Sequence, residues 1–195
     1  MILGMAHLST TELEDRLDHL RSSPTDAGTL ELVVARPAEG ERRVLGEASL
    51  DLSVGLVGDN WLARGSRHTP DGSAQPDKQL NVINARLARL VAGDEVDRRA
   101  LAGDQLHVDL DLSVENLPAG TRLAIGDTAV IEVTPDPHNG CAKFTQRFGL
   151  DAMRFVNSPV GKQLRLRGLC ARVVVQGPIR PGDTVVVARP GATQV

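Results

Sequence analysis

The chain has 195 residues, of which 41% are apolar and 24% charged, so it lies in the globular range and is long enough to bury one sizeable core. Only 2% are aromatic, with no Tyr, so the core must be mostly Leu, Val, Ile and Ala, and stacking on nucleic-acid bases is not expected. The net charge is −3 and there is no long basic run, which argues against a nucleic-acid partner.

The sequence gives no sign of export or membrane insertion. Its first residues, 1–8, are too short and too lightly charged for a signal peptide, and no stretch approaches the roughly 20 apolar residues that span a bilayer. We therefore expect a cytoplasmic protein. In such a chain a single disulfide would be unusual, so Cys141 and Cys170 are expected to be free thiols.

The first 26 residues are predicted to form a helical appendage, 1–26, to a domain over 27–195. Ser9 and Glu12 have the spacing of a capping box, and leucines then recur at helical spacing until Pro24 stops the run. The pattern predicts one short amphipathic helix ahead of the main domain.

The main domain opens with strand signals and then a long irregular segment. Apolar and polar residues alternate over 29–36, and a second run follows over 44–54. Residues 58–78 lose all periodicity and are rich in Gly, Asp, Ser and Pro. Loops of this length tend to be mobile or functional, so we expect this one to form a wall of a cleft beside Cys141.

The remaining pattern predicts a mainly β protein. The clearest strand covers 105–112, where Leu106 and every second residue face the core while His107 faces the other side. Further elements are a helix over 85–92 between Asn84 and Gly93, a short helix over 94–101, strands over 79–83, 122–125, 129–133, 169–175 and 184–187, and helices over 142–157 hinged at Gly149. Many short strands with few helices predict a closed or nearly closed β-barrel with peripheral short helices.

Cys141 is the residue that most suggests chemistry. It follows Asn139 and Gly140 at a predicted helix start, with Lys143 and Arg147 close behind. A helix N-terminus and nearby cations favour the thiolate, which binds soft metals or carries sulfur. Taken alone, a single cysteine more often has no role.

Other candidates are weaker. His138 and Cys141 have ligand-type spacing but lack the further ligands that zinc requires. Cys170 lies in a predicted strand and fits core packing. Arg64, Arg67 and His68 could together hold a phosphate or another anion, although loop cations are usually solvated and idle. Phosphate loops, nucleophile elbows and dinucleotide fingerprints are absent from the sequence.

One long segment resembles a known family. From Leu123 onward, LAIGDTAVIEVTPDPHNGCAKFTQRFG is similar to the signature of MOSC domains, the molybdenum cofactor sulfurase C-terminal domains: a hairpin ending in Glu-Val-Thr, a Pro-containing loop and one cysteine at the head of a helix. GLVGDNW, PDKQL and GLCARVVVQGPIRPGD agree with it. The resemblance covers about residues 44–188 and is to the small stand-alone bacterial type.

The resemblance implies a β-barrel in which the matching cysteine, here Cys141, carries sulfur or ligates molybdenum. It implies a pterin molybdenum cofactor bound through the metal at Cys141. Further contacts to the cofactor are then expected from Arg64, Arg67, His68, Lys78, Asn139 and Lys143. One departure concerns the strand over 105–112: many relatives place an Arg near an Asn at its head to help hold the pterin, whereas this chain has Gly103-Asp104-Gln105.

Three functions stay open at this point. The first is a molybdenum-dependent reductase of N-hydroxylated or N-oxide compounds, a small-molecule substrate class. The second is a persulfide carrier that receives sulfur from a pyridoxal-phosphate-dependent cysteine desulfurase and passes it to a molybdenum-cofactor protein. The third is a binding module that has kept the fold and lost the chemistry. The sequence contains no desulfurase portion, so any sulfur would have to come from a partner.

Overall fold

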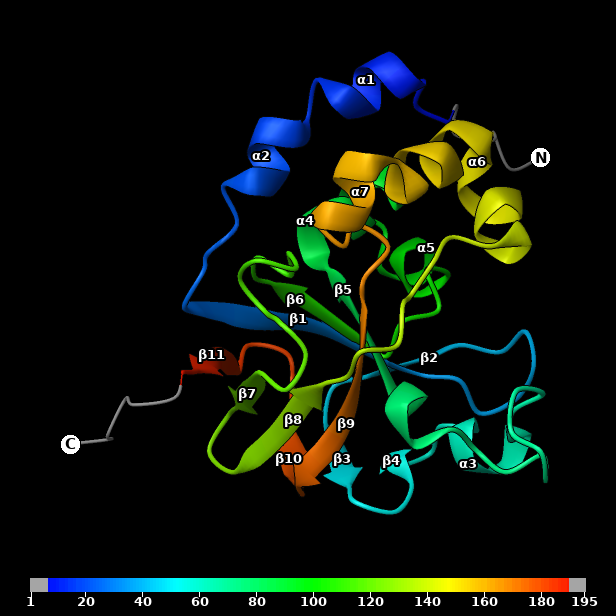
Figure 1. Ribbon diagram of the computed structural model, residues 1–195, viewed down its shortest axis with the longest axis vertical. Coiled ribbons are helices and arrows are strands. Elements are labelled where there is room, and N and C mark those ends of the chain that lie inside the picture. The colour runs from blue at the N-terminus through cyan, green and yellow to red at the C-terminus, as the bar shows by residue number, and fades with distance from the viewer. Residues whose placement is uncertain (1–6, 190–195) are drawn as a thin grey trace.

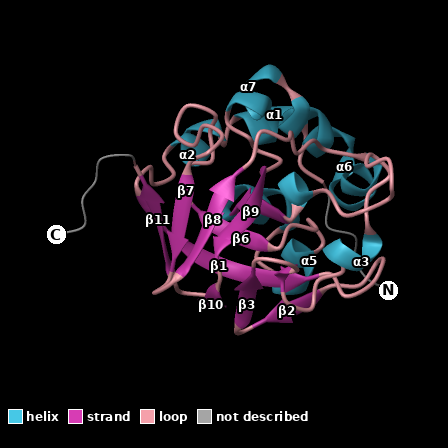
Figure 2. Ribbon diagram, turned by 60° about the horizontal axis from the view of Figure 1, so that its bottom comes forward, coloured by secondary structure: helices cyan, strands magenta, loops and turns pink. Residues whose placement is uncertain are grey.

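Seven strands close into a barrel in the computed structural model, which describes residues 7–189 (Figures 1 and 2). Around the barrel the order is β1, β11, β7, β8, β9, β5 and β6, and β6 returns to β1. Neighbours are antiparallel except β5 and β6, which are parallel. The outermost residues of the predicted segments 1–26 and 27–195 lie outside the described part.

Two smaller pieces of sheet extend the barrel: β2 pairs with β1, and β10, β3 and β4 form a separate sheet. The strands are β1 (Ala27–Ala35), β2 (Arg43–Leu45), β3 (Ala48–Asp51), β4 (Gly55–Leu56), β5 (Leu80–Asn84), β6 (Leu106–Asp109), β7 (Arg122–Ile125), β8 (Ala129–Val133), β9 (Leu169–Val175), β10 (Gly177–Ile179) and β11 (Thr184–Ala188). The mainly β, barrel-type fold predicted from the strand pattern is confirmed.

The helices gather mostly at one end of the barrel, the top in Figure 1. They are α1 (Thr10–Glu14), α2 (Leu17–Arg21), α3 (Trp61–Arg64), the 3-10 turn η1 (Pro76–Lys78), α4 (Ala85–Ala92), α5 (Val96–Ala100), α6 (Ala142–Asn157) and α7 (Pro159–Gln163). None of them, among the residues that the structure describes, is both long and apolar enough to cross a bilayer.

Two large apolar cores and one small cluster, of Leu32, Val34 and Ala100, result from this arrangement. The apolar cluster of the barrel consists of aliphatic side chains, among them Leu30, Leu110 and Val185, as the aromatic-poor composition predicts. A second core under the helices contains Phe144 and Phe148 together with apolar residues of α1, α2 and α4. Their rings lie 4.9 Å apart between centroids, at a tilt of 60°. α6, the helix that Cys141 precedes, is therefore anchored by the second core.

Four sequence expectations need correction. The single N-terminal helix is two helices, α1 and α2, and the run over 44–54 is divided into β2 and β3. The segment 58–78 contains α3 and η1 and is not wholly irregular. The alternating pattern predicts that His107 faces away from the core, but it is completely buried. The reason is that β6 lies between β1 and β5 while α4 packs against it, so both faces of the strand are covered.

Candidate functional site

Cys141 occupies the N-cap position of α6, with an extended backbone (φ −129°, ψ 177°). It is exposed, and its thiol makes no capping hydrogen bond. The preceding residue is fixed to the far end of the same helix: Gly140 N donates to Asn157 Oδ1 at 2.9 Å, and Asn157 Nδ2 donates to Gly140 O at 3.2 Å. The thiol is thus held in a defined place and left free to bind or react.

Cys170 lies in the opposite kind of environment. It is 1% exposed on β9, and Asn81 Nδ2 donates a hydrogen bond to its sulfur at 3.5 Å. Burial raises the pKa of the Cys170 thiol to about 11, so it stays protonated near neutral pH. The expected division between an exposed Cys141 and a buried, packing Cys170 is confirmed by this exposure.

Two guanidinium groups near the start of α6 form no direct ion pair among the described residues, although Asp59 and Asp104 are near enough to act on the charge of Arg42. Arg147 Nη1 donates to Leu101 O at 2.6 Å, and Arg42 Nη1 donates to Glu41 O, but neither side chain pairs with a carboxylate within residues 7–189. Both approach Gly103: a side chain there would place Cβ 3.3 Å from Arg42 Nη2 and 3.7 Å from Arg147 Nη1. Burial and the neighbouring Arg147 lower the pKa of Arg42, whose buried Nε has no hydrogen-bond partner.

A buried ion pair, between Arg36 and Asp59, lies next to Gly103. Arg36, at the end of β1, donates to both carboxylate oxygens of Asp59, from Nε at 2.8 Å and from Nη2 at 2.9 Å. Its Nη1 donates to Asn81 Oδ1 at 3.1 Å and to Gly103 O at 3.2 Å. One side chain therefore connects β1, the 58–78 segment, β5 and the turn before β6. Sequence reasoning missed it, because the pairing joins positions far apart in the chain.

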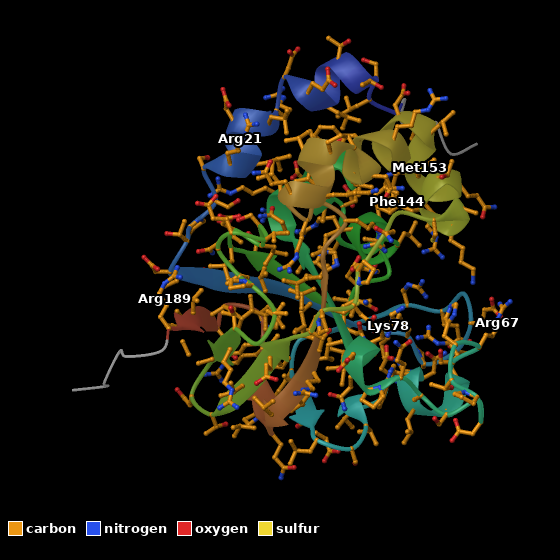
Figure 3. All side chains as sticks on the ribbon, viewed as in Figure 1. Arg21, Arg67, Lys78, Phe144, Met153 and Arg189 are labelled. Carbon is orange, nitrogen blue, oxygen red and sulfur yellow. The ribbon has the colours of Figure 1, made fainter. Side chains whose placement is uncertain are left out.

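The predicted cofactor residues are not all in one place. Lys143 is beside Cys141 and donates to Glu39 Oε1 at 2.8 Å, which holds the pKa of Glu39 below its usual range. Asn139 is exposed in the loop before Cys141. Arg64, Arg67 and His68 are exposed on and after α3; Figure 3 shows Arg67 at the outer edge of the molecule and Lys78 further in.

The 58–78 segment reaches the loop that leads to Cys141. Gln75 Nε2 donates to Asp136 Oδ2 at 2.6 Å, and Thr134 Oγ1 donates to Asp77 O at 2.6 Å. It is therefore a neighbour of the Cys141 loop. That it forms a wall of a cleft at Cys141 itself stays a prediction.

A fully buried carboxylate, Asp104, lies behind the same loop. Arg167 Nη1 donates to its two oxygens at 2.7 and 2.9 Å, and His138 Nε2 is 2.8 Å from Oδ1. Burial alone would raise the pKa of Asp104, but Arg167 and His138 together hold it well below its ordinary value. The Arg167 guanidinium also stands 5.0 Å above the Phe144 ring, which links this pair to α6.

Within the part of the chain that the structure describes, His, Cys, Asp and Glu side chains do not gather in threes as metal ligands. If a metal is bound at Cys141, ligands that the described side chains do not provide would have to complete its coordination.

Comparison with known proteins agrees with this architecture. The family described as MOSC domain matches residues 71–186 of the sequence, which run from the end of the 58–78 segment through Cys141 to β11. Comparison with curated proteins found no match.

Solved structures with the same fold include the YuaD protein of Bacillus subtilis, with a TM-score of 0.55 and 13% identity over 84% of this chain and 97% of that one. YiiM of Escherichia coli gives a TM-score of 0.52 and 20% identity over 85% of this chain and 72% of that one. YiiM of Geobacillus stearothermophilus gives 0.50 and 15%, over 87% and 76%. The matched segment, together with the barrel and a cysteine at the head of α6, shows that this chain belongs to the MOSC domain family.

Proposed function

We propose that this protein binds a pterin molybdenum cofactor, with Cys141 as the thiolate ligand of the metal, and that the loaded protein reduces N-hydroxylated small molecules. The observation that carries the proposal is the exposed thiol at the head of α6, close in the chain to Arg147, which pairs with no carboxylate of residues 7–189. A soft thiolate suits molybdenum, and the bound cofactor would supply the redox chemistry.

The residues present fit an anionic cofactor. Arg42 and Arg147 are two like charges held near one glycine, and a phosphate group accepting hydrogen bonds from both would relieve their repulsion. The buried Nε of Arg42, which has no partner within the described residues, is consistent with an absent anion. Gly103 leaves room here because it carries no side chain.

The two arginines near Gly103 also bear on the departure from the family pattern at Gly103-Asp104-Gln105. In many relatives an Arg and an Asn hold the pterin from the head of the strand that corresponds to β6. Here Gly103 occupies that position, but Arg42 and Arg147 reach it from other elements, and the Arg36–Asn81 contact lies directly against its carbonyl. We infer that these side chains substitute for the missing pair, with Lys143 as a further cation.

Metal and pterin analysis tests the proposal. The protein and its variants would be purified from a host that makes the cofactor, with molybdenum measured by mass spectrometry and pterin by the fluorescence of its oxidised form. Wild type should retain both, and Cys141→Ser should lose the metal. The double variant Arg42→Gln/Arg147→Gln loses two charge-assisted hydrogen bonds to the cofactor. It should therefore retain at most about one tenth of the pterin that wild type retains.

The matched control is Arg154→Gln, an exposed arginine on the same helix that forms an ion pair with Asp151 at 4.0 Å. It should retain as much cofactor as wild type. A wild-type protein free of both molybdenum and pterin would contradict the proposal, and so would equal retention by the double variant.

A second candidate is favoured by the exposure of Cys141: the thiol could carry sulfane sulfur as a persulfide. Incubation with a cysteine desulfurase, pyridoxal phosphate and cysteine should then add the mass of one sulfur atom to the Cys141 peptide and not to the Cys170 peptide. Transfer without bound molybdenum would select the carrier over the reductase.

A further inference from the structure

A pocket of 390 Å³ is lined in part by the loop that leads to Cys141, although Cys141 itself does not line it. Its walls come from that loop, from α7 and from the segment between α7 and β9. The apolar part of the lining is Val114, Pro135, Pro137, Val156 and Leu169. The polar part includes His138, Lys162 and Arg165. The volume falls within the ordinary range for small-molecule sites, roughly 300–1,000 Å³.

The tautomer of His138 follows from its partner. Asp104 is an ionised carboxylate and can only accept hydrogen bonds, so the His138 Nε2 that lies 2.8 Å away must carry the proton. Burial, with Arg167 and Arg36 nearby, lowers the pKa of His138 although Asp104 opposes this, so the ring is neutral near pH 7. Its Nδ1 is then a lone-pair acceptor with no hydrogen-bond donor among residues 7–189. His138 lines the pocket, and a ligand that carries a hydrogen-bond donor would satisfy this acceptor.

Arg165 has a backbone conformation that glycine adopts more easily than residues with a side chain do. It follows the end of α7 with φ 46°, in the left-handed region, which costs a residue with a side chain roughly 1–2 kcal/mol. Its Nη1 donates to Leu117 O at 2.6 Å, and within the described part of the chain it pairs with no carboxylate. Such strain at a pocket wall is typical of positions whose side chain is needed there.

The remaining charges of the lining leave the pocket positive. Arg167 is paired with Asp104, and Asp136 keeps its negative charge although it accepts a hydrogen bond from the neutral amide of Gln75, so Arg165 and Lys162 outnumber the one remaining carboxylate of the lining by one charge. Arg165 and the exposed Lys162 have no anionic partner within residues 7–189. A ligand that satisfies every group would place an anion on these two cations, an N–H or O–H donor on His138 Nδ1 and an apolar body against the prolines and Val156.

We propose that this pocket is a binding site for a small aromatic or aliphatic acid that also carries a hydrogen-bond donor, with Arg165 and Lys162 recognising the acid and His138 the donor. Asp104 is a positioning residue, since it holds the His138 ring and does not line the pocket, and Arg167, which does line it, is held in an ion pair with Asp104. The inference goes beyond the function proposed for Cys141 and does not depend on it.

The test is a nuclear magnetic resonance titration of the cofactor-free protein with 4-hydroxybenzoate, which has a carboxylate and a hydroxyl on one ring. Benzoate and phenol are the matched half-ligands. We expect saturable shifts of the His138 ring resonances with 4-hydroxybenzoate at millimolar concentrations, and binding of each half-ligand weaker by about tenfold, since each loses one polar contact.

Variants separate recognition from folding. Arg165→Gly should bind 4-hydroxybenzoate about tenfold more weakly while its melting temperature changes little, because relief of the backbone strain at φ 46° offsets the loss of the hydrogen bond to Leu117 O. His138→Phe, which has no lone pair to accept a hydrogen bond, should abolish the preference for 4-hydroxybenzoate over benzoate. Cys141→Ser and the exposed control Arg180→Ala should bind as wild type.

Absence of saturable binding by wild type would overturn the proposal, as would unchanged binding by Arg165→Gly. Neither result would affect the metal and pterin analysis, which measures a different ligand at a different residue, Cys141.

Discussion

The thiols of Cys141 and Cys170 differ only in what surrounds them. Native alkylation with iodoacetamide at pH 7 should label Cys141 and leave Cys170 unmodified until the protein is denatured. Cys170 is sealed from the reagent, and at a pKa of about 11 only about one of its thiols in ten thousand is ionised. Peptide mass mapping gives the sites, and Cys141→Ser should remove native labelling. Faster labelling of Cys170 would contradict both functions proposed for Cys141.

His107 should make the stability of the protein depend on pH. Both ring nitrogens are buried without partners, and burial, with Arg99 and Arg167 nearby, lowers its pKa from 6.5 to about 4 although Asp104 opposes this. The unfolded chain therefore binds a proton first as the pH falls. The stability due to the neutral ring is complete above pH 6.5 and is lost as the pH falls towards 4.

Urea unfolding at pH 7 and pH 5 measures this effect. Wild type should lose about 2 kcal/mol more of its free energy of unfolding over this interval than His107→Leu, which cannot titrate. Other groups, His138 included, titrate in both proteins and cancel in the comparison. Parallel losses in the two proteins would show that His107 is not the group responsible.

At the scale of elements, local signals were predictable and distant pairings were not. The capping box of Ser9 and Glu12 and the Asn84 cap of α4 form as the sequence indicates, because each needs only residues two or three positions apart. The bend in α6 at Gly149 (φ 90°) was likewise expected from the glycine.

The polar contacts of the candidate site, in contrast, join residues that are far apart in the sequence. Arg36 meets Asp59 across 23 positions, and Arg167 meets Asp104 across 63. Nothing in the local pattern of either segment indicates its partner, since closure of the barrel brings them together. For the same reason Asp104 could be seen only as a departure from a family pattern, and its role in holding His138 came from the structure.

Gly168, between α7 and β9, should tolerate a side chain much less well than Gly182 does. Both have positive φ, 105° and 98°, so alanine strains both backbones. At Gly168 the new Cβ would also lie 2.3 Å from Val82 O and 3.2 Å from His138 Cδ2, whereas at Gly182 it meets nothing within 4 Å. Gly182→Ala should cost about 1 kcal/mol and Gly168→Ala about 3 kcal/mol or more in thermal unfolding. Equal costs would rule out the predicted clash at Gly168.

The whole molecule is organised around one strand that serves both cores. On β5, Val82 points into the barrel and Ile83 into the helical core, as alternate residues of a strand must. α1 and α2 supply Leu13 and Leu20 to the helical core, where they join Phe144 and Phe148 of α6. The helix that follows Cys141 is therefore held by the N-terminal segment as well as by the barrel.

This arrangement predicts that equivalent cavities in the two cores will have different local effects. Leu13 and Leu110 are both completely buried, so replacing either by alanine should cost about 3 kcal/mol of global stability. Leu13→Ala should additionally speed native-state hydrogen exchange in α6 and α4, because these helices share its core and can open without the barrel.

Leu110→Ala should instead raise exchange evenly, because the closed barrel opens as one unit. Mass spectrometry of exchanged peptides distinguishes the two patterns. If the α6 peptides of Leu13→Ala exchanged no faster than its barrel peptides, the two cores would form a single cooperative unit. In that case the inference from their packing, that the N-terminal helices stabilise α6 independently of the barrel, would be wrong.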